Sequence, residues 1–362
     1  MTKYQIGNLQ VIRALAALSV VLDHTFATSF KGLVSEDNYE YIHTLLNDLG
    51  WFGVNVFFVL SGFLMIFTQN DEKKSYRFIY DRIIRIYPAY ILLSIPIIIF
   101  ALTPSQYDHR IYNTYQLVQN IILMPGWEGM SYSNANYPAW TLVYEMFFYI
   151  IFSGVLLFSR KKSHISIAIS LILVCLIVIY KSVLNSNGTQ QLTDIKHLLG
   201  NLILLNFAAG CLLGAFFKKG NLNVNGKLFL IATILIFGLS SVVRMKLSAH
   251  SGMGADIIFG TITASIVIYI ALCSQEIKNR VIKIIGDASY SIYLTHVTLL
   301  LIKNKIMNML GLFDSIYSVL LCNIIFVPIS ISVGIMSYQL VERPLMNILK
   351  KVTYLRKIER PE

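Results

Sequence analysis

Residues 13–24 read RALAALSVVLDH, an apolar run of helical character with charged or titratable side chains at both ends. A charged side chain inside a bilayer costs roughly 3 kcal/mol or more, and such residues usually face a protein interior or a water-filled cavity. Arg13, Asp23 and His24 are therefore candidate functional residues. The run has no small-residue cleavage site of the kind that follows a signal peptide. We expect it to be a retained first membrane span near 9–29.

The composition of the whole chain predicts an integral membrane protein. Of its 362 residues, 56% are apolar and only 14% are charged, and the mean hydropathy is +0.63. Soluble domains carry about 25% charged residues. The four cysteines and seven histidines are scattered singly. Their spacing predicts neither a disulfide framework nor a metal site.

Ten apolar stretches of about 20 residues are long enough to cross a bilayer. They lie near 9–29, 50–69, 86–103, 139–159, 164–181, 197–217, 228–245, 254–274, 286–304 and 315–341. The predicted fold is all-α, a polytopic membrane helix bundle of about ten transmembrane helices. The longest polar connection, 104–138, contains the apolar patch LVQNIILM (117–124), which is expected at the interface or against the bundle.

The distribution of basic residues predicts the orientation of the bundle. Of the 30 Lys and Arg residues, 21 fall on the side of the N-terminus and eight on the other, with Arg13 set aside. Cytoplasmic loops carry the excess of Lys and Arg, so both termini are expected in the cytoplasm. The net charge of +11 then reflects topology and attraction to anionic membrane lipid. No nucleic-acid partner is predicted.

Arg13 and His24 share one face of the first predicted helix. Eleven residues at 100° each come within about 20° of three full turns, and they rise about 16 Å. Arg13 is expected near the cytoplasmic boundary and His24 in the outer half of the bilayer. Two interpretations are open: a functional pair, or interior polar residues satisfied by neighbouring helices.

The stretch DRIIRIYPAY (81–90) places Arg82 and Arg85 at the cytoplasmic mouth of the third predicted span. Residues at this i, i+3 spacing point the same way on a helix. Two guanidinium groups suit phosphate oxygens. The alternative is a basic stop at the membrane edge.

The stretch NYPAWTLVYEMFFYIIF (136–152) puts a carboxylate inside the fourth predicted span. Pro138 suits the first turn of a helix. Glu145 then lies about 10 Å below the outer surface, close to the depth expected for His24. A carboxylate and an imidazole at one depth can orient each other for acid–base chemistry. Trp140 is either an interfacial anchor or the wall of a pocket.

Three further features are weaker. Small residues in GWFGVNVFFVLSGF (50–63) are expected to allow close helix approach: Gly50, Gly53, Ser61 and Gly62. His296, at the end of GDASYSIYLTH (286–296), is interpreted as structural. Glu342, after the last span, is interpreted as the partner of a basic loop.

Together these stretches resemble acyltransferase family 3, the multi-span membrane acyltransferases that modify surface glycans and related acceptors. The resemblance rests on RALAALSVVLDH, GWFGVNVFFVLSGF, RIIR, PAWTLVYE and GDASYSIYLTH, which follow one another in order from the first predicted span to the ninth. It implies a stand-alone membrane unit in a bacterial inner membrane. Residues 1–345 would form the transmembrane acyltransferase domain and 346–362 a basic cytoplasmic tail.

The resemblance also implies a reaction and a set of site residues. The donor would be cytosolic acyl-CoA, taken as acetyl-CoA, and the acceptor a hydroxyl of a cell-surface or lipid-linked polysaccharide such as O-antigen or exopolysaccharide. His24 would be the general base, oriented by Asp23 or Glu145. Arg82, Arg85 and Arg13 would bind the donor and Trp140 the substrate. No metal is implied.

Other mechanisms and classes of protein stay open. A covalent acyl-histidine relay would use the same imidazole as a nucleophile. A transporter or flippase of a lipid-linked sugar would also bury Arg, Asp, Glu and His residues as a proton relay. The lack of an inverted repeat in the sequence and the RxxR mouth count against that class. A lipid-binding scaffold would explain the basic face but neither Glu145 nor His24.

Overall fold

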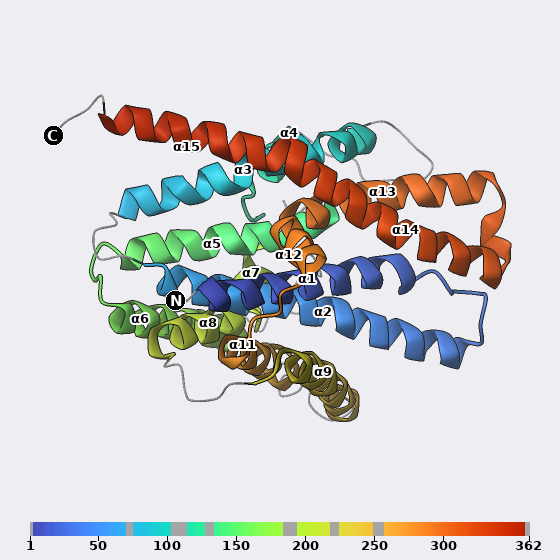
Figure 1. The fold of residues 1–362 in the computed structure, drawn as a ribbon, viewed down its shortest axis with the longest axis horizontal. Coiled ribbons are helices and arrows are strands. Elements are labelled where there is room, and N and C mark those ends of the chain that lie inside the picture. The colour runs from blue at the N-terminus through green and yellow to red at the C-terminus, as the bar shows by residue number, and fades with distance from the viewer. Residues whose placement is uncertain are drawn as a thin grey trace.

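A computed structural model describes residues 3–69, 75–102, 114–126, 134–183, 194–217, 224–248 and 257–358. Within these ranges the chain is helical, and its extended pairings are two isolated β-bridges, Gly126 with Asp194 and Val224 with Ser274. The helices, shown in Figure 1, are α1 (Lys3–Phe26), α2 (Glu36–Phe67), α3 (Ser75–Leu102), α4 (Thr114–Ile122), α5 (Trp140–Val155), α6 (Lys162–Val183), α7 (Ile195–Gly200), α8 (Leu204–Phe216), α9 (Gly226–Ser248), α11 (Thr263–Cys273), α12 (Arg280–Asp287), α13 (Ser289–Met309), α14 (Ile316–Ser337) and α15 (Arg343–Ile358). Short 3-10 turns, η1 (Tyr137–Ala139) and η3 (Leu312–Asp314), and π-helical turns, η2 (Ile257–Ile262) and η4 (Tyr338–Glu342), extend or join them.

The described helices account for every predicted span. Seven are long and apolar enough to cross a membrane, and α12 with α13, bent by 72° at their junction, form an eighth candidate. Two shorter apolar helices, Leu204–Phe216 and Ile257–Cys273, lie on the predicted stretches 197–217 and 254–274. The prediction of a polytopic helix bundle is confirmed.

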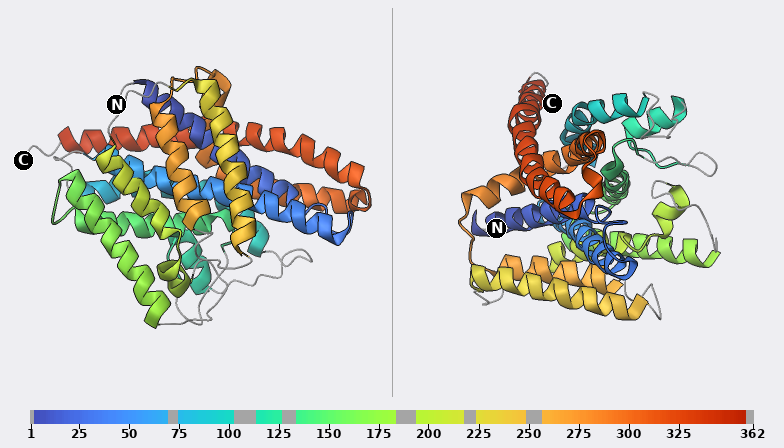
Figure 2. Two further views of the ribbon diagram at one scale, coloured as in Figure 1. Left: turned by 90° about the horizontal axis from the view of Figure 1, so that it is seen from below. Right: turned by 90° about the vertical axis from the view of Figure 1, so that its right-hand side faces the viewer.

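Helices α1 and α2 occupy the middle of the bundle. Figure 2 shows them between α9 and α11 on one side and α13 and α14 on the other. Small residues of α2 allow close packing on both neighbours, as the sequence predicts. Gly53 lies against Ala16 of α1, and Gly62 lies against the backbone of Phe207 in α8. A Cβ atom at either glycine would collide with a carbonyl group.

Helix α2 begins at Glu36, fourteen residues before the predicted apolar stretch 50–69. Acidic residues in its first turn, Glu36 and Asp37, suit the positive end of the helix dipole. Hydropathy detects the part of a helix that meets hydrocarbon and not the polar extension beyond it. Within α2, Asp48 is fully buried and forms an ion pair with Arg244 of α9.

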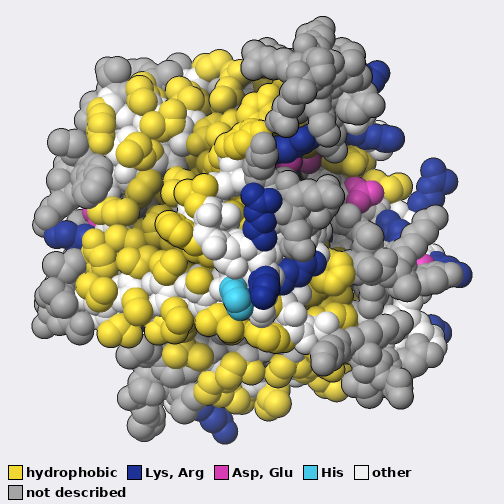
Figure 3. Space-filling model, turned by 90° about the vertical axis from the view of Figure 1, so that its left-hand side faces the viewer, with side chains coloured by type: hydrophobic (Ala, Val, Ile, Leu, Met, Phe, Trp, Pro, Cys, Tyr) yellow, Lys and Arg dark blue, Asp and Glu magenta, His cyan; other side chains and the backbone are white. Residues whose placement is uncertain are grey.

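Two hydrogen bonds place four helix ends on one face of the bundle. The Lys162 ammonium, at the start of α6, donates to the Phe67 carbonyl at the end of α2, over 2.8 Å. The Ser75 hydroxyl, at the start of α3, donates to the Ser153 carbonyl near the end of α5, over 2.6 Å. Figure 3 views this face, where Lys and Arg side chains gather near the centre and along one side. That this face meets the cytoplasm stays a prediction from the charge distribution.

The apolar patch in the connection 104–138 packs against α3. The phenol of Tyr90 donates to the carbonyl of Asn120 over 2.7 Å, and that of Tyr87 donates to the carbonyl of Ile122 over 2.5 Å. This contact agrees with the expectation that 117–124 lies against the bundle. Parts of the connection, 104–113 and 127–133, lie outside the described residues. The predicted basic tail, 346–362, continues α15 as far as Ile358.

Candidate active site

A cavity of about 120 Å³ lies among α1, α2, α3, α5 and α13. Four of the residues singled out in the sequence line it: Arg13, Arg82, Arg85 and Glu145. The remaining polar lining comes from Ser61, Thr141, Tyr149, Ser289, Tyr290 and Tyr293. The fold thus gathers three cationic side chains and one carboxylate, from three helices, around one space.

The arginines are held at the cavity by aromatic and polar neighbours. The Arg82 guanidinium lies 5.0 Å from the ring centre of Phe78 and 5.4 Å from that of Tyr149. Such contacts attract a cation to the ring face. Its Nε atom is buried without a hydrogen-bond partner. Arg85, one turn later, is exposed, whereas Arg82 is half-buried.

Arg13 reaches the same cavity from α1. Its guanidinium lies 3.5 Å from Oε1 of Gln10, at the limit of a hydrogen bond. Glu342 lies close enough to act on Arg13 and Arg85 electrostatically. Its carboxylate accepts a 2.5 Å hydrogen bond from the Ser291 hydroxyl. Glu342 therefore contacts α13 and faces two site arginines, whereas the sequence suggested only a basic loop.

Glu145 belongs to this cationic cavity. Its carboxylate accepts hydrogen bonds from the Ser61 hydroxyl, over 3.3 Å, and from the Tyr149 phenol. Ser289, at the start of α13, also lines the cavity, and its hydroxyl is buried without a hydrogen-bond partner. The sequence motifs do not single out Tyr149 or Ser289. The i, i+4 spacing of Tyr149 from Glu145 could have indicated that the two side chains are neighbours on one helix.

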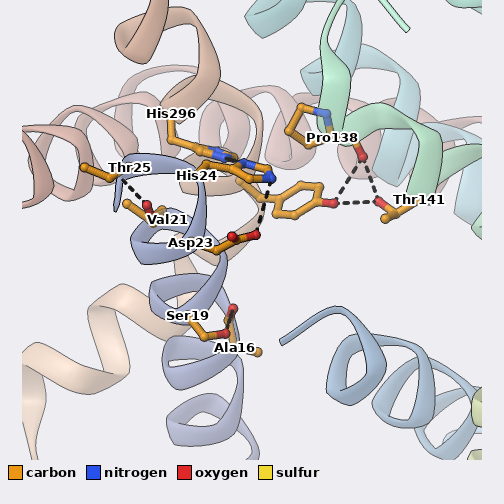
Figure 4. A network of polar contacts seen from close by, with 10 residues as sticks. Ala16, Ser19, Val21, Asp23, His24, Thr25, Pro138, Thr141 and His296 are labelled. Atoms are coloured by element: carbon orange, nitrogen blue, oxygen red, sulfur yellow. Dashed lines mark hydrogen bonds and ion pairs between the residues drawn. The ribbon is translucent and has the colours of Figure 1, made fainter. Parts of the chain in front are cut away.

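A second polar cluster forms at the other end of α1. Nδ1 of His24 lies 2.8 Å from Nε2 of His296 on α13. The two rings are stacked, with centres 5.1 Å apart and planes 15° apart. Nε2 of His24 lies 3.9 Å from the Asp23 carboxylate. Figure 4 shows His24 between Asp23 and His296, with Pro138 and Thr141 of the neighbouring segment close by. His296, interpreted from sequence as structural, is in direct contact with the candidate base.

The expected common depth of His24 and Glu145 is wrong. The His24 ring lies 5.9 Å from that of Tyr137, at the start of η1. Glu145 follows eight residues later, more than about 12 Å further along the chain axis at 1.5 Å per α-helical residue and 2.0 Å per 3-10 residue. The estimate failed because His24 lies only two residues before the end of α1, at Phe26. Asp23, and not Glu145, is the carboxylate beside His24.

Tyr293 connects the two clusters. Its side chain lines the cavity, and its ring centre lies 5.9 Å from that of His296. Its hydroxyl lies 3.0 Å from the Thr141 hydroxyl and donates to the Pro138 carbonyl over 3.1 Å. Tyr293 and Thr141 therefore form the end of the cavity that faces the histidine pair.

Trp140 packs inside the protein. Its side chain is 6% exposed. Its ring centre lies 5.6 Å from that of Trp51 and 5.5 Å from that of Tyr144. The interpretation as an interfacial anchor is therefore wrong, because the ring is enclosed by protein. The cavity is lined by the next residue, Thr141, so Trp140 stands behind the cavity wall.

Among the residues that the structure describes, no group of three or more His, Cys, Asp and Glu side chains could hold a metal ion.

The fold and the two clusters define a membrane protein with a cationic cavity between its helices. A pair of histidines, His296 buried and His24 half-buried, lies at the other end of α1. The chain belongs to acyltransferase family 3: the family model, described as an acyltransferase domain, matches residues 6–337. It is therefore a multi-pass membrane acyltransferase.

Two relatives show how far the similarity extends. The exopolysaccharide production protein ExoZ of Rhizobium meliloti (strain 1021) is 27% identical over 312 residues, which cover 83% of this chain and 90% of ExoZ. The acyltransferase MdmB of Streptomyces mycarofaciens is 29% identical over 153 residues, 41% of this chain and 38% of MdmB. No solved structure matches the chain.

Proposed function

We propose that the protein transfers an acetyl group from acetyl-CoA to a hydroxyl of a cell-surface or lipid-linked polysaccharide. The observation that carries the proposal is the arrangement of charge along α1. Three arginines, among them Arg13 of α1, surround one cavity. His24 lies eleven residues after Arg13 on the same helix, about 16 Å away. A donor with a phosphorylated end and a distant thioester fits this separation.

The arginine cavity would hold the phosphates of the donor. Guanidinium groups bind phosphate oxygens through paired, charge-assisted hydrogen bonds. Arg82 has a buried Nε without a partner, and Ser289 has a buried hydroxyl without one. Both groups line the cavity and would gain a hydrogen bond from an anionic ligand. The thioester arm would then extend past Tyr293 toward His24.

His24 would act as the general base. The acceptor hydroxyl gives its proton to the imidazole as its oxygen attacks the thioester carbonyl carbon. The tetrahedral intermediate then collapses, the carbon–sulfur bond breaks, and the CoA thiolate takes the proton back from the imidazolium. Asp23, 3.9 Å from Nε2 of His24, would stabilise that imidazolium. In the relay alternative the imidazole itself accepts the acyl group before the hydroxyl does.

The acceptor class is supported by the relative ExoZ, whose name refers to exopolysaccharide production and which aligns over 90% of its length. A bacterial inner membrane, with the basic face toward the cytoplasm, would give access to cytosolic acetyl-CoA.

The test uses the purified protein in lipid nanodiscs with acetyl-CoA labelled in the acetyl group. Wild-type protein should bind acetyl-CoA and label a polysaccharide acceptor, and His24→Gln should bind the donor but not transfer the label. A trapped acetyl-histidine in the absence of acceptor would select the relay mechanism. If wild-type protein does not bind acetyl-CoA, the donor assignment is overturned. If His24→Gln transfers the label as fast as wild type, the role of His24 is overturned.

A further inference from the structure

The contact between His24 and His296 joins two helices that are far apart in sequence. The two residues are separated by 272 positions, and their nitrogens lie 2.8 Å apart. At this distance one hydrogen atom must lie between Nδ1 of His24 and Nε2 of His296. His296 is 1% exposed, so water does not supply an alternative partner.

The direction of this hydrogen bond follows from the second contact of His296. Its Nδ1 lies 3.1 Å from the carbonyl oxygen of Ile292, one turn earlier on α13. A carbonyl oxygen only accepts, so Nδ1 of His296 must carry a hydrogen. A neutral imidazole carries one N–H, which leaves Nε2 of His296 as an acceptor.

A protonated, charged His296 would donate from Nε2 and so reverse the direction of its hydrogen bond with His24. The surroundings of His296 disfavour such a charge. The described contacts of its ring are with His24, Tyr293 and the Ile292 carbonyl, and none of these is a carboxylate. Burying an ionised group without an opposite charge is costly. The neutral ring therefore accepts, and Nδ1 of His24 donates.

We propose that His296 is a positioning residue that holds His24 in the tautomer with hydrogen on Nδ1 and a lone pair on Nε2. Nε2 of His24 is then the atom that takes the proton from the acceptor hydroxyl. This inference rests on the proposed function of His24 as the base. It also gives Asp23 a place in the reaction, because the Asp23 carboxylate lies beside Nε2 and becomes its ion-pair partner once the proton arrives.

Two substitutions of similar size separate positioning from packing. In His296→Gln the amide oxygen can occupy the place of Nε2 and accept from His24, whereas His296→Met fills the space with a far weaker acceptor. Loss of one neutral hydrogen bond, worth about 1 kcal/mol, changes the tautomer ratio roughly fivefold to tenfold. Such a change takes the reactive tautomer from most of the molecules to about half of them. We therefore expect kcat to fall about twofold in His296→Met and to stay at the wild-type value in His296→Gln. The KM for acetyl-CoA should be unchanged in both, because the arginine cavity is untouched.

The tautomer itself can be measured without a substitution at His296. In protein labelled with 15N-histidine, the resonances of His24 are identified by their loss in His24→Gln. We expect Nε2 of His24 to resonate in the unprotonated range in wild type, and the hydrogen to be shared between both nitrogens in His296→Met. A protonated Nε2 in neutral wild-type protein would overturn the inference.

Equal kcat values for His296→Met and wild type, with transfer still dependent on His24, would also overturn the inference while leaving the proposed function intact. Full transfer by His24→Gln would instead overturn the proposed function, and this inference with it.

Discussion

Glu145 shows how one residue takes its role from its surroundings. Its carboxylate is the one acidic side chain among the described residues lining the arginine cavity, and it is held by Ser61 and Tyr149. If the arginines bind phosphate as proposed, a carboxylate beside them opposes anion binding by Coulomb repulsion. We therefore expect Glu145 to weaken ligand binding in the cavity, a role different from the acid–base function that the sequence suggested.

We predict that Glu145→Gln binds CoA more tightly. The amide keeps a hydrogen-bond acceptor for Tyr149 but removes one negative charge. The repulsion between two unit charges within about 15 Å, at an effective dielectric constant of about 20, is roughly 1 kcal/mol or more. The dissociation constant for CoA, measured by calorimetry in nanodiscs, should fall at least fivefold, with kcat within about threefold of wild type. Loss of transfer at saturating donor would return Glu145 to the chemical step.

Arg82→Ala combined with Arg85→Ala is expected to weaken donor binding. Hydrogen bonds to charged groups are worth about 1.5–3 kcal/mol, so the affinity for acetyl-CoA should fall roughly tenfold to a hundredfold. Arg77→Ala is the matched control, since Arg77 is exposed on the same helix and is absent from the cavity lining. Equal affinities in the double variant and the control would identify RxxR as a basic membrane-edge signal.

At the scale of helices, glycines set the distance between α2 and α8. Gly62 lies against the backbone of Phe207, and Gly210 lies against the carbonyl of Val59. This reciprocal contact brings two backbones together along the helix that also carries Ser61 at the cavity. Gly238 of α9 offers a contrast, because a Cβ there meets no atom within 4 Å.

We predict that Gly62→Ala destabilises the protein by about 1–3 kcal/mol, the usual cost of forcing an extra methyl group into a packed interior. Gly238→Ala should be neutral or stabilise by up to about 1 kcal/mol through helix propensity. Thermal unfolding of the two purified variants in one detergent measures the difference. A melting temperature of Gly62→Ala at or above that of Gly238→Ala would show that α8 can move away freely.

The contact between α5 and α7 makes stability depend on pH. The Tyr144 hydroxyl lies 3.1 Å from Nδ1 of His197. Burial lowers the pKa of His197 below its ordinary value, and nearby Asp194 partly offsets this. The unfolded chain then binds more protons than the folded one below about pH 6.5, so stability falls as the pH drops through this range.

His197→Gln should remove this share of the acid sensitivity. The melting temperature of wild type should drop more than that of His197→Gln between pH 7.5 and pH 5, since only wild type has an imidazole to protonate at this position. An identical drop in both proteins would contradict the assignment.

At the scale of the molecule, the sequence predicted the helices better than their contacts. Apolar length located a helix at each of the ten predicted stretches, because long apolar runs are typical of membrane helices. Seven of the described helices, or eight with the bent pair α12 and α13, are long enough to cross a membrane. Apolar length did not reveal that α2 starts at Glu36, since a polar extension has no hydropathy signal. Helical periodicity put Arg13 and His24 on one face. It could not reveal that His24 contacts His296, because the two residues are 272 positions apart in the sequence. The common depth predicted for His24 and Glu145 was wrong because the depth of His24 depends on where α1 ends.

The orientation of the whole bundle can be tested with single cysteines. In a background with the four native cysteines replaced, Lys31→Cys should react with a membrane-impermeant maleimide in intact cells, and Lys161→Cys only after permeabilisation. Both lysines are exposed. Lys31 lies in the connection between α1 and α2 and Lys161 in that between α5 and α6, and Figure 1 shows these connections at opposite ends of the bundle. Labelling of Lys161→Cys in intact cells would reverse the predicted topology.

The length of α2 has a mechanical consequence. Its 32 residues span about 48 Å, whereas the hydrocarbon of a bilayer is about 30 Å thick. We therefore expect α2 to extend beyond the hydrocarbon at its polar Glu36 end. Further along the same helix, Gly50 contacts the Asp23 carboxylate and the Ser61 hydroxyl donates a hydrogen bond to Glu145. Because one continuous helix makes both contacts, any tilt of α2 would shift the surroundings of Asp23 and of Glu145 together.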